Sequence, residues 1–268
     1  MTYQPVVPIS GYAGWRFLNR TLDMQKQAFE ESSTIVRKSD YFRENITKIK
    51  SAEELVGNRR LLEVALGAFG LDDDINNKFY IEKVLSEGTI NDDSLANKLS
   101  DKRYAAFSEA FGFGNMGGAG RVRFDGFADE ILEKYDDRQF ELAVGEQDNS
   151  MRLALNMPSA LDEVLSNSST IDGQWFSLMG NTPIRTMFET ALGFSSSFGS
   201  LDIDLQLSNF KERSESVFGT SDLSEFQDSE MQEKLTRLFL VQSEINAIGN
   251  LGSNSIALTL LQSAPRYY

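Results

Sequence analysis

Hydrophobic residues near the start of the chain recur at alternating spacings of three and four, which is the periodicity of one helix face. This stripe consists of Trp15, Leu18, Leu22, Gln25 and Phe29, and four of its five members are apolar. We interpret it as the core-facing side of a helix. The alternative is a coiled-coil seam toward a partner, which would require more heptads than the segment contains. In that alternative Trp15, Leu18, Leu22 and Phe29 are the candidate interaction residues.

The segment 51–114 carries the clearest signals for helix starts and ends. Ser51 and Glu54 have the spacing of a capping box, so a helix is expected to begin there. An apolar helix face follows and stops at Gly70, which we expect to be a left-handed residue that ends the helix. The acidic run 72–74 would then favour the start of the next helix by complementing its dipole. The apolar face is formed by Leu61, Leu62, Ala65, Leu66 and Phe69.

Similar patterns predict helices through the rest of the chain, and few prolines interrupt them. Two further short helices are expected before residue 112. A stretch with five glycines, residues 112–120, is the candidate hinge between two halves. We therefore predict an all-α, multi-helix bundle-like fold with an irregular arm at 1–9, a first half at 10–113 and a second half at 121–268, packed on the first as one compact unit. The later helices are expected at about 124–147, 151–165 with an interruption near Pro158, 201–218 and 229–248, followed by an apolar run at 256–261.

The first half also has a weak echo in the second half. The sequence VGNRRLLEVALG, residues 56–67, aligns with MGNTPIRTMFETALG, residues 179–193, if a small insertion follows the Gly-Asn pair. Further on, Gly88-Thr89 has a counterpart in Gly219-Thr220, and Asp101 has one in Asp228. We interpret this as a degenerate internal duplication that relates residues 51–113 to residues 173–241. Chance repetition of helix starts and ends is the alternative.

Composition narrows the possible partners and chemistry. The net charge is −14, so we expect no binding to nucleic acid or to anionic lipid. No stretch is long and apolar enough for a spanning helix, and no cleaved signal peptide is visible. We therefore expect a cytoplasmic protein. The chain has no His and no Cys, which excludes imidazole and thiolate ligands and the usual general base at neutral pH.

Two strings resemble known binding motifs but fail at required positions. Residues 112–117 match the spacing GxGxxG, yet a helix rather than a strand is predicted before them, so a flexible connection is favoured over a dinucleotide site. Asp72, Asp74 and Asn76 occupy the first positions of a calcium loop. That loop needs Gly and Glu where this chain has Asn77 and Lys83, so we expect no metal site and no cofactor.

The remaining charged residues leave one enzymatic alternative open. Forty acidic residues could include a catalytic carboxylate pair, so a hydrolase or a small-ligand-binding protein that uses acidic residues is the second hypothesis. The simplest interpretation of the conspicuous basic pairs is that they lie on solvated helix faces or form ion pairs. An anion-binding site is the alternative. No catalytic constellation is visible, and we expect a protein that is not an enzyme. The basic pairs are Arg59 with Arg60 and Lys102 with Arg103.

The block AFGLDDDINNKFYIEKVLSEG, followed by SLANKLSDKRYAAFSEAFGFG, resembles a bacterial family called domain of unknown function number twelve-seventeen. The likeness extends to GYAGWRFLNRT near the start, to FELAVGEQDNSMRLALN and to FETALGFSSSFGSLDIDLQL. Members of that family occur largely in alphaproteobacteria, commonly within flagellar gene clusters. The resemblance therefore implies a role in flagellar structure or assembly, and it supplies no catalytic residues.

From this resemblance we expect a non-enzymatic structural or interaction protein of the flagellum. It would be a basal-body or axial component, or an assembly factor. Its partners would be flagellar or assembly proteins, or further copies of itself, and export to the flagellum without a cleaved signal is an alternative to the cytoplasm. Axial subunits of flagella often have terminal segments that order on assembly, and residues 1–30 and 229–268 are the candidates here.

Overall fold

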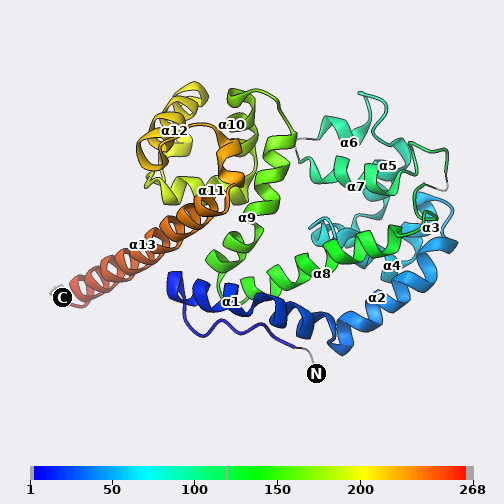
Figure 1. The fold of residues 1–268 in the computed structure, drawn as a ribbon, viewed down its shortest axis with the longest axis horizontal. Helices are drawn as coiled ribbons and strands as arrows, with labels where there is room; N and C mark the ends of the chain where they lie inside the picture. The colour runs from blue at the N-terminus through cyan, green and yellow to red at the C-terminus, as the bar shows by residue number, and fades with distance from the viewer. Residues whose placement is uncertain (1–2, 100, 119, 264–268) are drawn as a thin grey trace, which may run out of the picture. The chain divides into compact units, whose positions relative to one another are not determined.

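A computed structural model describes residues 3–99, 101–118 and 120–263, and the side chains only as far as Ile248. Within these ranges the chain forms thirteen α-helices, four short 3-10 helices and no strand (Figure 1). Helices make up 74% of the structure. The predicted all-α, multi-helix fold is therefore confirmed.

The chain divides into two compact units. Unit 1 comprises residues 1–6 and 21–143, and unit 2 comprises residues 7–20 and 144–268. The division falls inside two helices, α1 (Gly11–Glu30) and α8 (Phe127–Gly145). It does not fall at the glycine-rich segment, where the sequence suggested a hinge, because both sides of that segment belong to unit 1.

Unit 1 is built around α4, which packs against α2 and α3, and around α5, which packs against α3 and α7. A cluster of phenylalanine rings fills its core. Phe107 and Phe111 lie one turn apart on α7 with ring centroids 5.1 Å apart, and Phe127 meets Phe111 edge to face at 5.3 Å. Besides α1 and α8, the elements are α2 (Ser33–Asn45), η1 (Ile46–Lys48), α3 (Ala52–Gly57), α4 (Arg59–Gly67), η2 (Asp72–Asn76), α5 (Lys78–Glu87), α6 (Leu95–Lys98) and α7 (Arg103–Phe111).

Unit 2 has its own aromatic core around Trp175, which is fully buried. The Trp175 ring stacks on Phe210 at 5.4 Å and meets Phe188 edge to face at 5.7 Å. Its indole Nε1 donates a hydrogen bond to the Ser221 carbonyl at 2.8 Å, so the polar end of this large side chain is satisfied. The elements are α9 (Asn149–Ser166), α10 (Ile171–Gly180), α11 (Thr182–Ala191), η3 (Phe198–Ser200), α12 (Ile203–Phe218), η4 (Leu223–Gln227) and α13 (Ser229–Ser263).

The helix α9 runs without a break through Pro158, where the sequence suggested an interruption. A proline inside a helix removes one backbone hydrogen bond and costs about 3 kcal/mol. The burial of α9 along its length offsets that cost, because α9 packs against α10, α11, η4 and α13. Its buried side chains are Met151, Leu153, Ala154, Met157, Ala160, Leu161 and Val164.

An asparagine joins two helices at the same place in each unit. Asn58 ends α3 and begins α4, and Asn181 ends α10 and begins α11. Their backbone angles are nearly identical, with φ and ψ of −96° and 93° at Asn58 and −97° and 99° at Asn181. Each side chain accepts a hydrogen bond from the amide three residues later, at Leu61 and at Ile184. The two junctions are therefore one local structure that occurs twice.

A left-handed glycine ends the second helix of each pair. Gly70 has φ 66° and Gly193 has φ 72°. In the first unit Leu71 N–H donates to the Leu66 carbonyl, and Gly70 N–H donates to the Gly67 carbonyl. This is the Schellman pattern, and it confirms the predicted helix end at Gly70. The second unit repeats both hydrogen bonds, from Phe194 to Glu189 and from Gly193 to Thr190.

The glycines correct the register of the duplication. The same number of residues separates Asn58 from Gly70 and Asn181 from Gly193, so no insertion is needed. The partner of Ala191-Leu192-Gly193 is Ala68-Phe69-Gly70, and not the identical triplet Ala65-Leu66-Gly67. In this register six buried apolar positions coincide: Ala52 with Trp175, Leu55 with Leu178, Val56 with Met179, Leu61 with Ile184, Val64 with Met187 and Ala65 with Phe188.

The correspondence continues beyond the glycines. In each unit a 3-10 helix follows, then a helix that ends at a glycine with positive φ, Gly88 or Gly219. An aspartate lies just before the last helix of each repeat. Asp101 accepts the Arg103 amide at 3.0 Å, and Asp228 accepts the Glu230 amide at 2.9 Å. We call these regions repeat 1, from α3 to α7, and repeat 2, from α10 to the start of α13.

The glycine-rich segment makes close backbone contacts within unit 1. Gly114 N–H donates to the Leu85 carbonyl at 3.0 Å, and a Cβ on Gly114 would collide with the backbone of Gly88. Asn115 connects the same two segments, because its side chain accepts the Thr89 amide at 2.7 Å and donates to the Thr89 hydroxyl at 2.9 Å. These glycines permit close approach of the backbone, which is the physical reason why the segment is not the boundary between the units.

Candidate functional site

The N-terminal stripe on α1 faces the protein's own core. Trp15, Leu18 and Phe29 are buried and Leu22 is half-buried. Phe29 meets Phe140 of α8 edge to face at 5.7 Å, inside unit 1. The interpretation as a core-facing helix is therefore confirmed. Binding of a partner through Trp15, Leu18, Leu22 and Phe29 stays a prediction, and it would require these side chains to leave the core.

Gln25 is the polar member of the stripe, and it holds the N-terminal arm. Its side chain accepts the Val6 amide at 2.6 Å and donates to the Val6 carbonyl at 3.2 Å. Residues 3–9 contain no helix. This two-way hydrogen bond explains why a buried position of an apolar stripe carries an amide side chain.

The acidic residues 72–74, which begin the sequence that resembles a calcium loop, have structural roles. Residues 72–74 form the first turn of η2 and do not cap α5. Asp74 accepts hydrogen bonds from the Tyr104 hydroxyl at 2.6 Å and from Asn77 at 2.7 Å. Burial and this carboxylate raise the pKa of Tyr104. Among the described residues, no three acidic side chains lie close enough together to hold a metal ion.

The capping box at the start of α3 differs in one bond from the expected pattern. Ser51 Oγ accepts the Glu54 amide at 3.2 Å, as predicted. The Glu54 carboxylate accepts the Lys50 amide at 2.8 Å, one residue before the expected donor. The box therefore stabilises the helix start.

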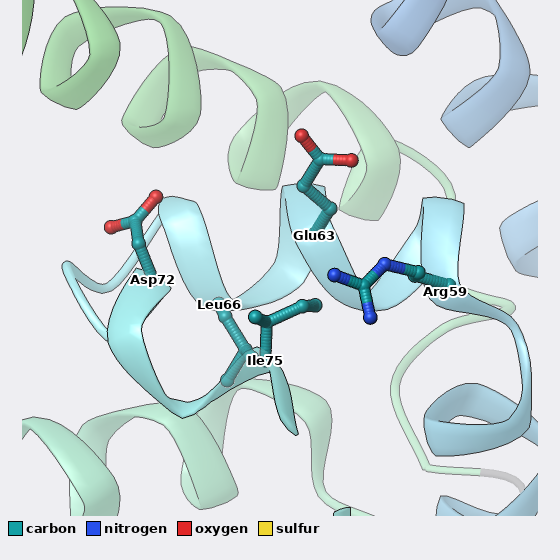
Figure 2. A pocket seen from close by; sticks show the side chains of 5 residues that line it. All are labelled: Arg59, Glu63, Leu66, Asp72 and Ile75. Atoms are coloured by element: carbon teal, nitrogen blue, oxygen red, sulfur yellow. The ribbon is translucent and has the colours of Figure 1, made fainter. Parts of the chain in front are cut away.

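A pocket beside α4 contains the carboxylates that an acidic hydrolase would need (Figure 2). Arg59, Glu63 and Leu66 of α4 line it together with Asp72 and Ile75 of η2. Figure 2 shows that the carboxylates of Glu63 and Asp72 lie on the side away from Leu66 and Ile75 and do not point toward each other. Glu63 is half-exposed and pairs with Lys38 at 2.6 Å, while Asp72 accepts a hydrogen bond from Gln139 at 3.2 Å.

The basic pairs of repeat 1 have structural partners. The Arg60 guanidinium lies over the Tyr41 ring, 3.5 Å from its centroid, and Arg59 donates to the Asn76 side chain at 3.2 Å. Arg103 pairs with Asp101 at 2.7 Å, and Lys102 donates to the Leu99 carbonyl at 3.1 Å. These contacts account for the basic pairs without an anion.

One carboxyl group has a strongly altered pKa. Asp136 of α8 is half-buried, and its Oδ1 is buried without a hydrogen-bond partner. Burial raises the pKa of Asp136 to about 7, and repulsion from Glu30 and Asp137 acts in the same direction against the attraction of Arg43. Asp136 therefore retains its proton far longer than an exposed carboxyl does as the pH rises.

The clearest exposed apolar surface on a long helix lies on α13. Its early turns pack against α9, α11 and η4, and Leu235, Phe239 and Leu240 are buried. Figure 1 shows the later turns of α13 continuing past α11. There Val241, Ile245 and Ile248 are spaced by four and three residues and are 41%, 54% and 70% exposed. We call these three residues the α13 stripe; the predicted apolar run at 256–261 lies in the same helix, but its side chains are outside the described ones.

The fold and these surfaces define a class: an all-α protein that carries a duplicated helical module and extends its last helix with an exposed apolar stripe. Among the described residues, no helix has the length and apolar composition that crossing a membrane requires.

The chain belongs to the family described as "Protein of unknown function (DUF1217)", which matches residues 68–231, well over half of the chain. The resemblance read from the sequence is thereby confirmed. No curated protein matches the chain. It is similar to the crystal structure of protein AGR_C_984 from Agrobacterium tumefaciens, with a TM-score of 0.71 and 24% sequence identity. The match covers 91% of this chain and 99% of the other, and it shows a shared fold.

Proposed function

We propose that this protein is a non-enzymatic interaction protein associated with the bacterial flagellum, as a basal-body or axial component or as an assembly factor. The observation that supports an interaction role is the α13 stripe. An apolar helix face that remains exposed gains free energy when a partner covers it, at roughly 25 cal/mol per Å² of buried apolar surface. The flagellar part of the proposal rests on the gene-cluster association that the family resemblance implies.

The proposed partners are flagellar or assembly proteins, or further copies of this chain. The proposed location is the cytoplasm, or the flagellum after export without a cleaved signal. Nucleic acid is a poor partner, because the net charge of −14 repels a polyanion.

A hydrolase or a small-ligand-binding protein that uses acidic residues is the second candidate. It would use the pocket lined by Glu63 and Asp72. The geometry supports it less well, because a glycosidase-like pair needs one carboxyl group in an apolar environment and one left ionised across a shared cleft. Here both carboxylates already have partners within the fold, in Lys38 and Gln139.

A deletion strain tests the proposal. Loss of the protein is expected to abolish or impair swimming and to reduce the number of complete flagella, as seen by electron microscopy, and a copy of the gene should restore both. Full motility with normal flagella in the deletion strain would contradict the proposal. As a test of the second candidate, a complementing copy with Glu63→Gln and Asp72→Asn should restore swimming fully.

A further inference from the structure

The α13 stripe lies where α13 leaves the core of unit 2. Every described side chain after Leu240 is exposed or half-buried, although the helix continues to Ser263. From Val241 to Ser263 the helix is about 34 Å long at 1.5 Å per residue. Most of the stability of such a helix in water comes from packing of its apolar face. Glu244 lies against Gly11 at the start of α1, yet Val241, Ile245 and Ile248 stay 41%, 54% and 70% exposed.

The sequence of these turns differs in charge from the rest of the protein. A quarter of all residues are charged, yet no Asp, Glu, Lys or Arg lies between Glu244 and Arg266. The turns after Glu244 offer no charged side chain to a partner that is recognised by salt bridges. They match a surface that is equally uncharged and apolar, and the same turns of another copy have that character.

We propose that the α13 stripe is a self-association surface, on which α13 of a second copy of this chain packs through Val241, Ile245 and Ile248. The inference rests on the proposed function only in treating this face as an interaction surface. Pairing of identical segments gives a closed two-fold interface, the commonest arrangement of homo-oligomers. It places Ile245 and Ile248 of the uncharged turns at the contact, while the Glu244 carboxylate lies against Gly11 of the same copy.

The net charge of the protein should make dimerisation depend on the salt concentration. Two copies that each carry a charge of −14 repel one another, and salt screens that repulsion over about 10 Å at 0.1 M. Dimerisation through an uncharged face should therefore strengthen as salt is added. Binding to a basic partner would weaken under the same conditions, so the direction of the salt effect separates these two kinds of occupant.

Sedimentation velocity of the purified full-length chain, from low to high micromolar concentration and at low and high salt, tests the proposal. We expect a monomer–dimer equilibrium that shifts toward dimer with concentration and with salt. Ile248→Glu and Ile248→Lys are expected to weaken dimerisation at least tenfold, and agreement between the two excludes a simple effect of added charge. Both side chains replace a residue that is 70% exposed, so helical circular dichroism and the melting temperature should not change.

The matched control is Phe79→Glu, which adds the same charge at a residue that is 81% exposed in unit 1. It should dimerise like the wild type. A wild-type chain that stays monomeric at every concentration would overturn the proposal, as would an Ile248→Glu variant that dimerises normally. Binding of the monomer to phosphatidylcholine vesicles, lost in Ile248→Glu, would also overturn it in favour of a lipid surface. A monomeric chain whose deletion still abolishes swimming would contradict this inference and leave the proposed function standing.

Discussion

Repeat 1 and repeat 2 share their turns but differ in the side chains that fill their cores. Both are built on an asparagine junction, a Schellman glycine, a later glycine with positive φ and an aspartate just before the last helix. Where repeat 1 has Ala52 and Ala65, repeat 2 has Trp175 and Phe188 at equivalent buried positions. The polar residues that start and end helices have thus been kept while the volumes of the core side chains changed. In a close-packed core such changes require matching changes among the neighbours.

The two repeats also end differently. In repeat 1 the last helix, α7, stops at Gly112 with φ 68°. In repeat 2 the corresponding helix, α13, continues to Ser263 and carries the exposed stripe. The shared turns therefore belong to the fold, and the proposed interaction surface lies on the extension of repeat 2.

Removing the large aromatic residue of repeat 2 should have the largest effect. Trp175→Ala is expected to lower the free energy of unfolding by about 3–5 kcal/mol, because it leaves a cavity beside Phe210 and Phe188. Urea unfolding followed by circular dichroism measures this. The reverse change, Ala52→Trp in repeat 1, should destabilise by about 1–3 kcal/mol through overpacking. If either substitution is neutral, the two cores are more interchangeable than the structure indicates.

The two units should also respond differently to pH, because Asp136 lies in unit 1. Its folded-state pKa of about 7 is above its ordinary value of 3.8, so its protonation favours folding. This contribution is complete below about pH 4 and is lost as the pH rises toward 7. Asp136→Asn is expected to stabilise the protein at pH 7.5 by about 1–2 kcal/mol, a value reduced for partial exposure, with little effect at pH 4.

Hydrogen exchange at the two pH values locates this effect. We expect protection factors, which are corrected for base catalysis of amide exchange, to fall with rising pH in α2, in α8 and in the part of α1 that belongs to unit 1, and to change less in repeat 2. An equal fall in both units, or a pH dependence that Asp136→Asn leaves intact, would show that another group is responsible.

Substitution of two glycines of repeat 2 should have the smallest effects on stability, and these effects test the conformation of the repeated turn. Gly193→Ala should destabilise by about 1 kcal/mol, since φ is 72° there while no atom lies within 4 Å of the added methyl group. Gly180, at the end of α10, is equally uncrowded but does not have positive φ, so Gly180→Ala should stabilise by about 0.5 kcal/mol. Thermal melts of the two variants should therefore shift in opposite directions. Shifts of the same sign would remove the conformational argument for the Schellman turn.

The sequence predicted the local features that depend on single residues. Gly70 ends its helix in a left-handed conformation, and Ser51 caps α3, because these roles follow from backbone sterics and one hydrogen bond. The buried face of α1 was also predictable from its periodicity. The duplication was visible because the Gly-Asn pair recurs.

Features that depend on tertiary contacts were not predictable. The identical triplet Ala-Leu-Gly favoured a wrong register, because only the hydrogen bonds show that Gly70, and not Gly67, corresponds to Gly193. The glycine-rich segment looked like a hinge, since a sequence does not reveal that Gly114 lies against Gly88. The sequence indicated residues 229–268 as a candidate assembly segment but not the α13 stripe itself, because periodicity identifies an apolar face and does not show whether the rest of the chain covers it.

Swimming assays with point variants in the native gene test whether the α13 stripe is needed for function. We expect cells with Ile248→Glu to lose motility as the deletion strain does, although the protein is present at its normal level, and cells with Phe79→Glu to swim normally. Normal swimming of the Ile248→Glu strain, with complete flagella, would contradict the claim that the extension of repeat 2 is the working surface of this protein.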